Sequence, residues 1–218
     1  GIKAFCARPG DTNPDECHSI RIENCTILNA RRLGIMLQGR NLHVVNNRLG
    51  NAMSDSVELL GGPGFVTGNY VDITGRTHVA IGSDAGNSII MANNIVHIRE
   101  TGDLDIAFRS WANSERHVIS NNVLAVDPGG QLGLAMDVRG FDTSLTGNVI
   151  SGPEDENRLP LWITGSGATI TGNHFKNVNI IVNDETGTNR PIHLGGNLLE
   201  NAIVTHKMGN IVADGGAT

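Results

Sequence analysis

Aromatic side chains, positive charge and long apolar runs are all scarce in this sequence. Only 4% of the residues are Phe, Trp or Tyr, which argues against a core filled by large rings. With 16 Lys and Arg residues against 22 Asp and Glu residues, the formal net charge is −6, so no basic field is present to hold nucleic acid or an anionic membrane. Apolar runs are only a few residues long, as at Ser88–Ala92, so no segment is predicted to span a bilayer.

Cysteine signatures and targeting signals are equally sparse. The three cysteines, Cys6, Cys17 and Cys25, have no zinc-ligand spacing, and the sequence carries no signature of a metal site or a cofactor. A Cys6–Cys17 disulfide is one possibility, and Cys25 then remains as a small buried residue. The chain starts at Gly1 without a basic and apolar leader. We therefore expect that any targeting segment is absent or removed, and that the chain is a piece of a longer protein.

A repeat dominates what the sequence does contain. A Gly-Asn or Asn-Asn pair recurs along the chain, and its second residue falls at Asn47, Asn69, Asn94, Asn122, Asn148, Asn173 and Asn197, at spacings of 22 to 28 residues. Cys25, which follows Asn24 and precedes Asn47 by 22 residues, extends the series to eight repeats. Periods of about 20–50 residues are typical of solenoids, in which one repeat cannot bury its apolar face alone. We number the coils one to eight from Cys25 to Asn197.

Apolar residues keep a fixed register with this Asn position in every repeat. One stands three residues before it and another two residues after it, as Val66 and Val71 do around Asn69. A further apolar pair follows in alternation, such as Ile106 and Phe108. Apolar residues at every second position are typical of a β-strand. Each repeat is therefore predicted to hold three short strands, with a tight bend at the Gly/Asn–Asn pair, where Asn side chains can pair from coil to coil.

With three strands per coil and an Asn-containing bend, residues 19–207 resemble the right-handed parallel β-helix family of pectate lyases, polysaccharide epimerases and phage tailspikes. The predicted fold is all-β: a single-stranded right-handed parallel β-helix of about eight coils. It is flanked by an N-terminal extension or partial coil at 1–18 and a C-terminal tail at 208–218. The resemblance implies an extracellular or virion-surface location. It also implies polysaccharide binding on the sheet furthest from the Asn bend.

Loop lengths indicate coils four to six as the functional region. The spacing from the strand after the bend to the alternating strand is 8 residues in the first three coils, and 10, 12 and 11 residues in the next three. Insertions in repeat proteins map to one face, often the binding face. On the alternating strands, the predicted outward positions include three alanines, Ala80, Ala107 and Ala135, and the candidate site residues Glu58, His78, Asp105, Arg109, Asp137, Arg139 and Trp162.

Two of these residues form the predicted catalytic pair. Adjacent coils lie about 4.8 Å apart, so His78 is expected beside Asp105. Asp105 and Asp137 become diagonal neighbours, about 7–8 Å apart. Two carboxyls at that separation suit glycoside hydrolysis, in which one protonates the leaving oxygen and the other activates water or attacks the sugar.

The remaining candidates are predicted to bind substrate. Arg109 is expected beside Arg139, and the pair offers an alternative chemistry: both bind a uronate carboxylate while His78 serves as the base of a lyase or epimerase. Trp162, expected beside Asp137, offers a flat ring for a sugar. Glu58, two coils from Asp105, is predicted to be a binding residue. The competing interpretation of these outward charges is a set of solvated ladder pairs, worth about 0–1 kcal/mol each.

A second outward face of the predicted solenoid is apolar. Its residues follow the Asn position at Tyr70, Ile95, Val123, Val149 and Leu198, and precede it at Phe65, Ile90 and Val118. An apolar stripe of this kind usually marks a packing surface, and three β-helices pack side by side in the phage tailspikes that this chain resembles. The sequence therefore leaves open a non-catalytic spike or adhesin module, which acts as a rigid homotrimeric rod.

Overall fold

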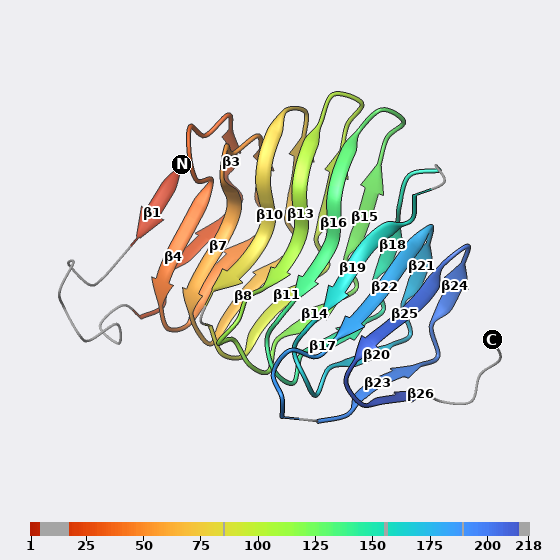
Figure 1. The fold of residues 1–218 in the computed structure, drawn as a ribbon. Helices are drawn as coiled ribbons and strands as arrows, with labels where there is room; N and C mark the ends of the chain where they lie inside the picture. The colour runs from red at the N-terminus through yellow and green to blue at the C-terminus, as the bar shows by residue number, and fades with distance from the viewer. Residues whose placement is uncertain (5–17, 85, 155–156, 189, 214–218) are drawn as a thin grey trace.

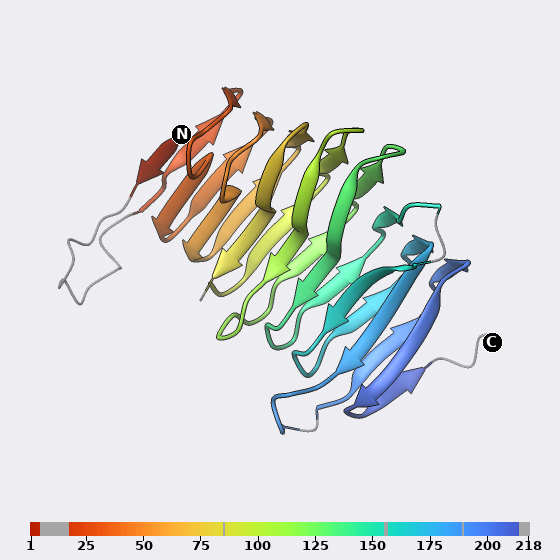
Figure 2. The ribbon, with the colours of Figure 1, turned by 45° about the horizontal axis from the view of Figure 1, so that its top comes forward.

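Each coil of the structure contributes one short strand to each of three parallel sheets. The computed structural model describes residues 1–4, 18–84, 86–154, 157–188 and 190–213. Neighbouring strands within a sheet are three apart in chain order and run parallel. The chain therefore winds as a right-handed solenoid of about seven full turns (Figure 1, Figure 2), which confirms the predicted fold class.

The three sheets have nine, nine and eight strands. The first sheet consists of β1 (Ile2–Ala4), β4 (Ile35–Gly39), β7 (Asp55–Gly61), β10 (Arg76–Asp84), β13 (Asp103–Ser110), β16 (Gln131–Val138), β19 (Leu159–Ile163), β22 (Val178–Asn183) and β25 (Ile203–Met208). The second consists of β2 (Arg21–Glu23), β5 (Leu42–Val45), β8 (Gly64–Thr67), β11 (Ile89–Ala92), β14 (Val118–Ser120), β17 (Ser144–Thr146), β20 (Thr169–Thr171), β23 (Ile192–Gly195) and β26 (Ile211–Ala213). The third consists of β3 (Thr26–Leu28), β6 (Arg48–Gly50), β9 (Tyr70–Ile73), β12 (Ile95–Ile98), β15 (Val123–Val126), β18 (Val149–Ser151), β21 (His174–Lys176) and β24 (Leu198–Glu200).

A ladder of buried asparagines joins the second and third sheets. The side-chain oxygen of Asn122 accepts hydrogen bonds from the backbone N–H and the side-chain Nδ2 of Asn94, both at 3.0 Å. Asn94 Nδ2 also donates to the carbonyl of Val66 at 2.8 Å. The preceding residue takes positive φ, with values of 56° at Asn93 and 53° at Asn121. The predicted bends therefore fall on one column, in which every buried amide finds partners.

The core lies between the three sheets and consists of the apolar positions that keep register with this ladder. In coils two to seven, the residue three positions before the Asn and the residue two positions after it are both buried. Val66, Val71, Met91 and Val96 are examples, each at 0% exposure. Because each coil covers the apolar face of the one before it, the core is continuous along the axis.

Strands extend the solenoid beyond the 19–207 range predicted from the repeats. Residues Ile2–Ala4 pair with β4, and residues Ile211–Ala213 pair with β23. The first segment has no Gly/Asn–Asn pair beside it, and Gly209-Asn210 precedes Ile211–Ala213 only 13 residues after Asn197, outside the spacing of the repeat. Cys25 is a free, half-buried thiol, whereas Cys6 and Cys17 lie outside the described residues.

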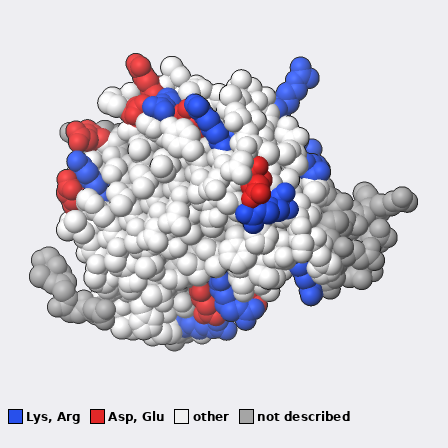
Figure 3. Space-filling view, turned by 180° about the vertical axis from the view of Figure 1, so that it is seen from behind, with Lys and Arg blue, Asp and Glu red and all other residues white. Residues whose placement is uncertain are grey.

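Charge is distributed unevenly over the three sheets. From β8 to β26, the strands of the second sheet contain no Lys, Arg, Asp or Glu. The view from behind shows the same scarcity across the middle of the molecule, with charged side chains towards its margins (Figure 3). On the third sheet, Ile95, Val123 and Val149 occupy consecutive rungs and are 41%, 37% and 39% exposed. The predicted outward apolar stripe is therefore present. No helix in the described residues is long and apolar enough to cross a membrane.

Candidate active site

Five strands of the first sheet bring four predicted site residues into one row. The register aligns one residue each from β7, β10, β13, β16 and β19: Glu58, Gly82, Arg109, Asp137 and Trp162. We call these five residues the charged row. The row confirms the prediction that Trp162 lies beside Asp137. The prediction that Arg109 lies beside Arg139 is wrong, because Asp137 occupies that position.

Arg109 holds three carboxylates around one nitrogen. Its Nη2 lies 3.0 Å from Asp55, 2.9 Å from Glu58 and 3.3 Å from Asp84. The side chains of Arg109, Asp55 and Glu58 are 8%, 3% and 7% exposed, while that of Asp84 is 33% exposed. Gly82 lies between Glu58 and Arg109 in the row, and the guanidinium packs over it: a Cβ there would lie 3.4 Å from Arg109 Nε and 3.5 Å from Nη2.

An irregularity in the first sheet accompanies this cluster. The backbone N–H groups of His78 and Val79 both donate to the carbonyl of Ser54, at 2.9 and 3.2 Å. A β-bulge is a place where two residues of one strand face a single residue of the neighbouring strand. It redirects side chains and is common beside active sites. Strict alternation fails at this point: three alanines predicted to face outward are wholly buried in the core, Ala80, Ala107 and Ala135. Sequence reasoning missed Asp55 and Asp84 because their role depends on this local geometry.

Burial raises the pKa of Glu58 from 4.5 to about 9. Desolvation is the largest cause, followed by the hydrogen bond with Asp55 and the negative charges of Asp55 and Asp84, while Arg109 opposes the shift. The Glu58 carboxyl therefore keeps its proton at neutral pH. Arg109 Nε is buried without a hydrogen-bond partner among the described residues, and Asp84 Oδ1 has only its ion pair with Arg109 Nη2. Buried polar atoms are usually satisfied, so these two atoms have unused hydrogen-bonding capacity.

An aromatic ring and a second guanidinium flank the cluster. Arg139 Nε donates to both oxygens of Asp137, at 3.0 and 3.1 Å, and Asp137 is 1% exposed. The ring of Trp111 lies 4.2 Å from the guanidinium carbon of Arg139 and 5.2 Å from that of Arg109. Trp111, which was not among the predicted site residues, thus contacts both cations of the site. Its position directly after β13, at the start of an expanded loop, was the available signal.

A separate charged group lies nearer the start of the same strands. His78 Nδ1 lies 2.7 Å from Asp105, which confirms that these residues are neighbours. Arg76 bridges Asp103 and Asp105, with both ion pairs at 2.7 Å. Burial works to raise the pKa of Asp105, but the hydrogen bonds from His78 and Arg76 outweigh it, and the net shift is downward. Asp105 is therefore an ionised, paired carboxylate and a poor proton donor.

The predicted diagonal contact between Asp105 and Asp137 is wrong. Ile106 pairs with Leu134, and Phe108 pairs with Met136, so Asp137 stands opposite Arg109. Asp137 is therefore four residues further along the strand direction than Asp105, about 13 Å of extended chain. The prediction aligned Ile106 with Met136. Leu132, Leu134, Met136 and Val138 continue one apolar alternation, so the pattern is the same after a slip of two residues.

Comparisons with known proteins add little to the site. No protein-family profile matches the chain, and no curated protein matches it. Among solved structures, the chain is similar to DFA-IIIase from Arthrobacter chlorophenolicus A6 without its lid, at 18% identity and a TM-score of 0.40, over 89% of this chain and 48% of that chain. A TibC-catalysed, hyper-glycosylated TibA fragment matches at 10% identity and a TM-score of 0.18, over 98% and 97% of the two chains. The chain thus spans about half the length of the first structure, and neither likeness assigns an activity.

Proposed function

We propose that the protein is an extracellular or virion-surface polysaccharide hydrolase whose active centre is the Arg109 cluster. One observation carries the proposal: Glu58, a buried carboxyl whose pKa is raised, and Asp84, a more exposed carboxyl, share one guanidinium nitrogen. Since that nitrogen lies 2.9 and 3.3 Å from the two groups, their nearest oxygens are within about 6 Å of each other. This pair replaces Asp105 and Asp137, which the register separates. Among the described residues, no group of three or more His, Cys, Asp or Glu side chains is arranged to hold a metal ion.

The two carboxyls have different tasks in this mechanism. Glu58 donates its proton to the glycosidic oxygen as the bond to the sugar breaks, and Asp84 takes a proton from the attacking water or attacks the sugar itself. Glycoside hydrolysis uses two carboxyls in different environments, and here the one with the raised pKa, Glu58, is buried while Asp84 is more exposed. Asp55 retains the proton on Glu58 through their hydrogen bond. Trp162, at the end of the charged row, supplies a half-buried ring beside Asp137 for an adjacent sugar.

The ion pairs favour a neutral glycan over a polyuronate. A lyase or epimerase acting on uronic acids needs a cation free to neutralise the sugar carboxylate. Arg109 is already surrounded by three carboxylates, and Arg139 is bound to both oxygens of Asp137. An additional carboxylate would enter a cluster with an excess of acidic groups, which disfavours it electrostatically.

The test is a reducing-end assay over a panel of neutral polysaccharides and polyuronates. E58Q and D84N are each expected to lower hydrolysis of the active glycan by 100-fold or more, the scale of general acid–base catalysis. D105N is the matched control, because Asp105 lies in the separate charged group, and it should retain activity. Full activity in E58Q and D84N, or release of unsaturated products from polyuronates, would refute the assignment.

A second candidate function rests on the exposed apolar column. Ile95, Val123 and Val149 form three consecutive outward rungs beside the charge-poor second sheet. Such a surface suits side-by-side packing of solenoids in a non-catalytic, homotrimeric spike. Sedimentation of the wild-type protein and of V123E distinguishes the two functions. A trimer that V123E dissociates, with no activity on any glycan of the panel, favours the spike.

A further inference from the structure

Coil five projects beyond coil six on one side of the solenoid. β15 pairs with β18 only at Val123 and Leu124, and β16 pairs with β19 only from Met136 onwards. Because β18 ends at Ser151 and β19 begins at Leu159, residue 126 of β15 and residues 131–133 of β16 have no strand opposite them on the coil-six side in the described part of the chain. The ribbon shows the corresponding step, where the tall loop between β15 and β16 stands above the coil that follows (Figure 1, Figure 2).

Apolar side chains are left open at this step. Val126 and Leu132 continue the core columns of Ile98 and Leu104, which are 0% and 1% exposed in coil four. In coil five the same positions are only half-buried. The difference arises because no coil-six strand among the described residues covers them. They are core-type side chains facing a space in which one more strand would bury them.

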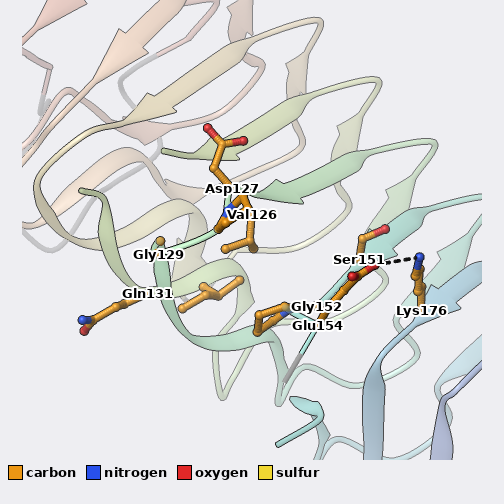
Figure 4. Close-up of a pocket in the computed structure, with 12 residues that line it drawn as sticks. Val126, Asp127, Gly129, Gln131, Ser151, Gly152, Glu154 and Lys176 are labelled. Carbon is orange, nitrogen blue, oxygen red and sulfur yellow. Dashed lines mark hydrogen bonds and ion pairs between the residues drawn. The ribbon is translucent and has the colours of Figure 1, made fainter. Parts of the chain in front are cut away.

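The open flank forms a cleft of about 920 Å³ between two loops (Figure 4). Val126, Leu132 and Pro153 contribute apolar lining, and Gly129, Gly130 and Gly152 keep the walls free of side chains. At the rim, Lys176 lies 3.4 Å from Glu154 and 3.4 Å from Glu200. Glu154 is 82% exposed and Glu200 is 53% exposed, so two acids face the one amine of Lys176, whereas Asp127 is paired with His97 at 2.7 Å.

We propose that this cleft binds an extended polypeptide strand with alternating apolar side chains and flanking basic residues. Its backbone pairs with the edge of β16 at 131–133, just before the residues that face β19. Main-chain pairing at an exposed sheet edge gives such complexes their affinity, and pockets for alternate side chains give specificity. Val126 and Leu132 receive the apolar side chains, while Glu154 attracts a basic one. A glycan fits less well, because no aromatic ring lines the cleft.

The experiment titrates the whole chain with a fluorescein-labelled peptide, Lys-Val-Ser-Val-Ser-Val-Lys, and follows fluorescence anisotropy. Saturable binding is expected, with L132D weakening it at least tenfold and E154K at least threefold. L28D is the matched control, because Leu28 is 53% exposed on the first coil and lies outside the cleft. It should bind like the wild type. Far-UV circular dichroism of each variant checks that the solenoid is intact.

Three further readouts decide the proposal. A peptide with proline in place of the central valine should fail to bind, because proline removes the donor that strand pairing needs. Hydrogen exchange should show new protection at 131–133. E58Q should bind the peptide as the wild type does, which separates this site from the proposed active centre. No saturable binding, equal binding of the proline peptide, unchanged affinity in L132D, or protection elsewhere would each overturn the proposal.

Discussion

Replacing Glu58 by Gln should stabilise the protein while removing its proton donor. In the folded state the pKa of Glu58 is raised to about 9, against 4.5 in the unfolded chain. The folded protein therefore holds a proton that the unfolded chain releases, and stability falls as pH rises from 4.5 towards 9. At 1.36 kcal/mol per pKa unit, the penalty at pH 7 is about 3 kcal/mol. Gln keeps the shape of the protonated acid, accepts from Arg109, donates to Asp55 and carries no such penalty.

Urea unfolding followed by far-UV circular dichroism at pH 4, 7 and 8.5 measures this effect. The free energy of unfolding of E58Q should match that of the wild type at pH 4, exceed it by roughly 3 kcal/mol at pH 7, and exceed it by about 5 kcal/mol at pH 8.5. E58A is the control for packing, because it removes the hydrogen bonds and leaves a cavity. If E58Q is no more stable than the wild type at pH 7 and 8.5, Glu58 is not a protonated buried acid and the mechanism loses its proton donor.

Three further predictions concern the scaffold. R109M should lower the free energy of unfolding by about 3–5 kcal/mol at pH 7, because it leaves buried carboxylates without their cation, and the loss measured in urea should shrink near pH 4. Burial lowers the pKa of His117 from 6.5 to about 4, so the unfolded chain takes up the proton first. Stability present above pH 6.5 should fall by about 3 kcal/mol towards pH 4, and H117Q should flatten this dependence. N122A should cost roughly 3 kcal/mol, because the partners of Asn122 lose their hydrogen bonds, whereas T146A on the exposed surface should change stability by less than about 0.5 kcal/mol.

Much of the fold follows from short-range pattern. The recurrent Asn positions and the apolar residues around them lie within a few residues of each other, so their register is written into each repeat. The same reasoning correctly placed His78 beside Asp105 and Trp162 beside Asp137. It failed between β13 and β16, where the alternating apolar run is longer than a pair, and between β7 and β10, where a bulge occurs at His78 and Val79. At the latter contact Ile81, not Val79, lies opposite Val57.

Those two slips account for the difference between the predicted and the observed site. A slip of two residues keeps every side chain on its face but moves it along the strand, and no pattern of period two detects it. The slip between β7 and β10 moves Glu58 into the row of Arg109, and the slip between β13 and β16 moves Asp137 there. The bulge at His78 and Val79 lies opposite Ser54, the residue before Asp55, and Asp55 joins the carboxyls around Arg109.

By itself, the sequence determined the winding of the chain, the column of bends and the acidic and aromatic residues available on the outer strands, because these depend on composition and on spacing within one repeat. Only the tertiary structure decided which acids share Arg109, which carboxyl keeps its proton, and where coil six leaves the flank of coil five open. Those properties depend on strand register and burial between coils, and both are set by contacts between residues some 25 positions apart.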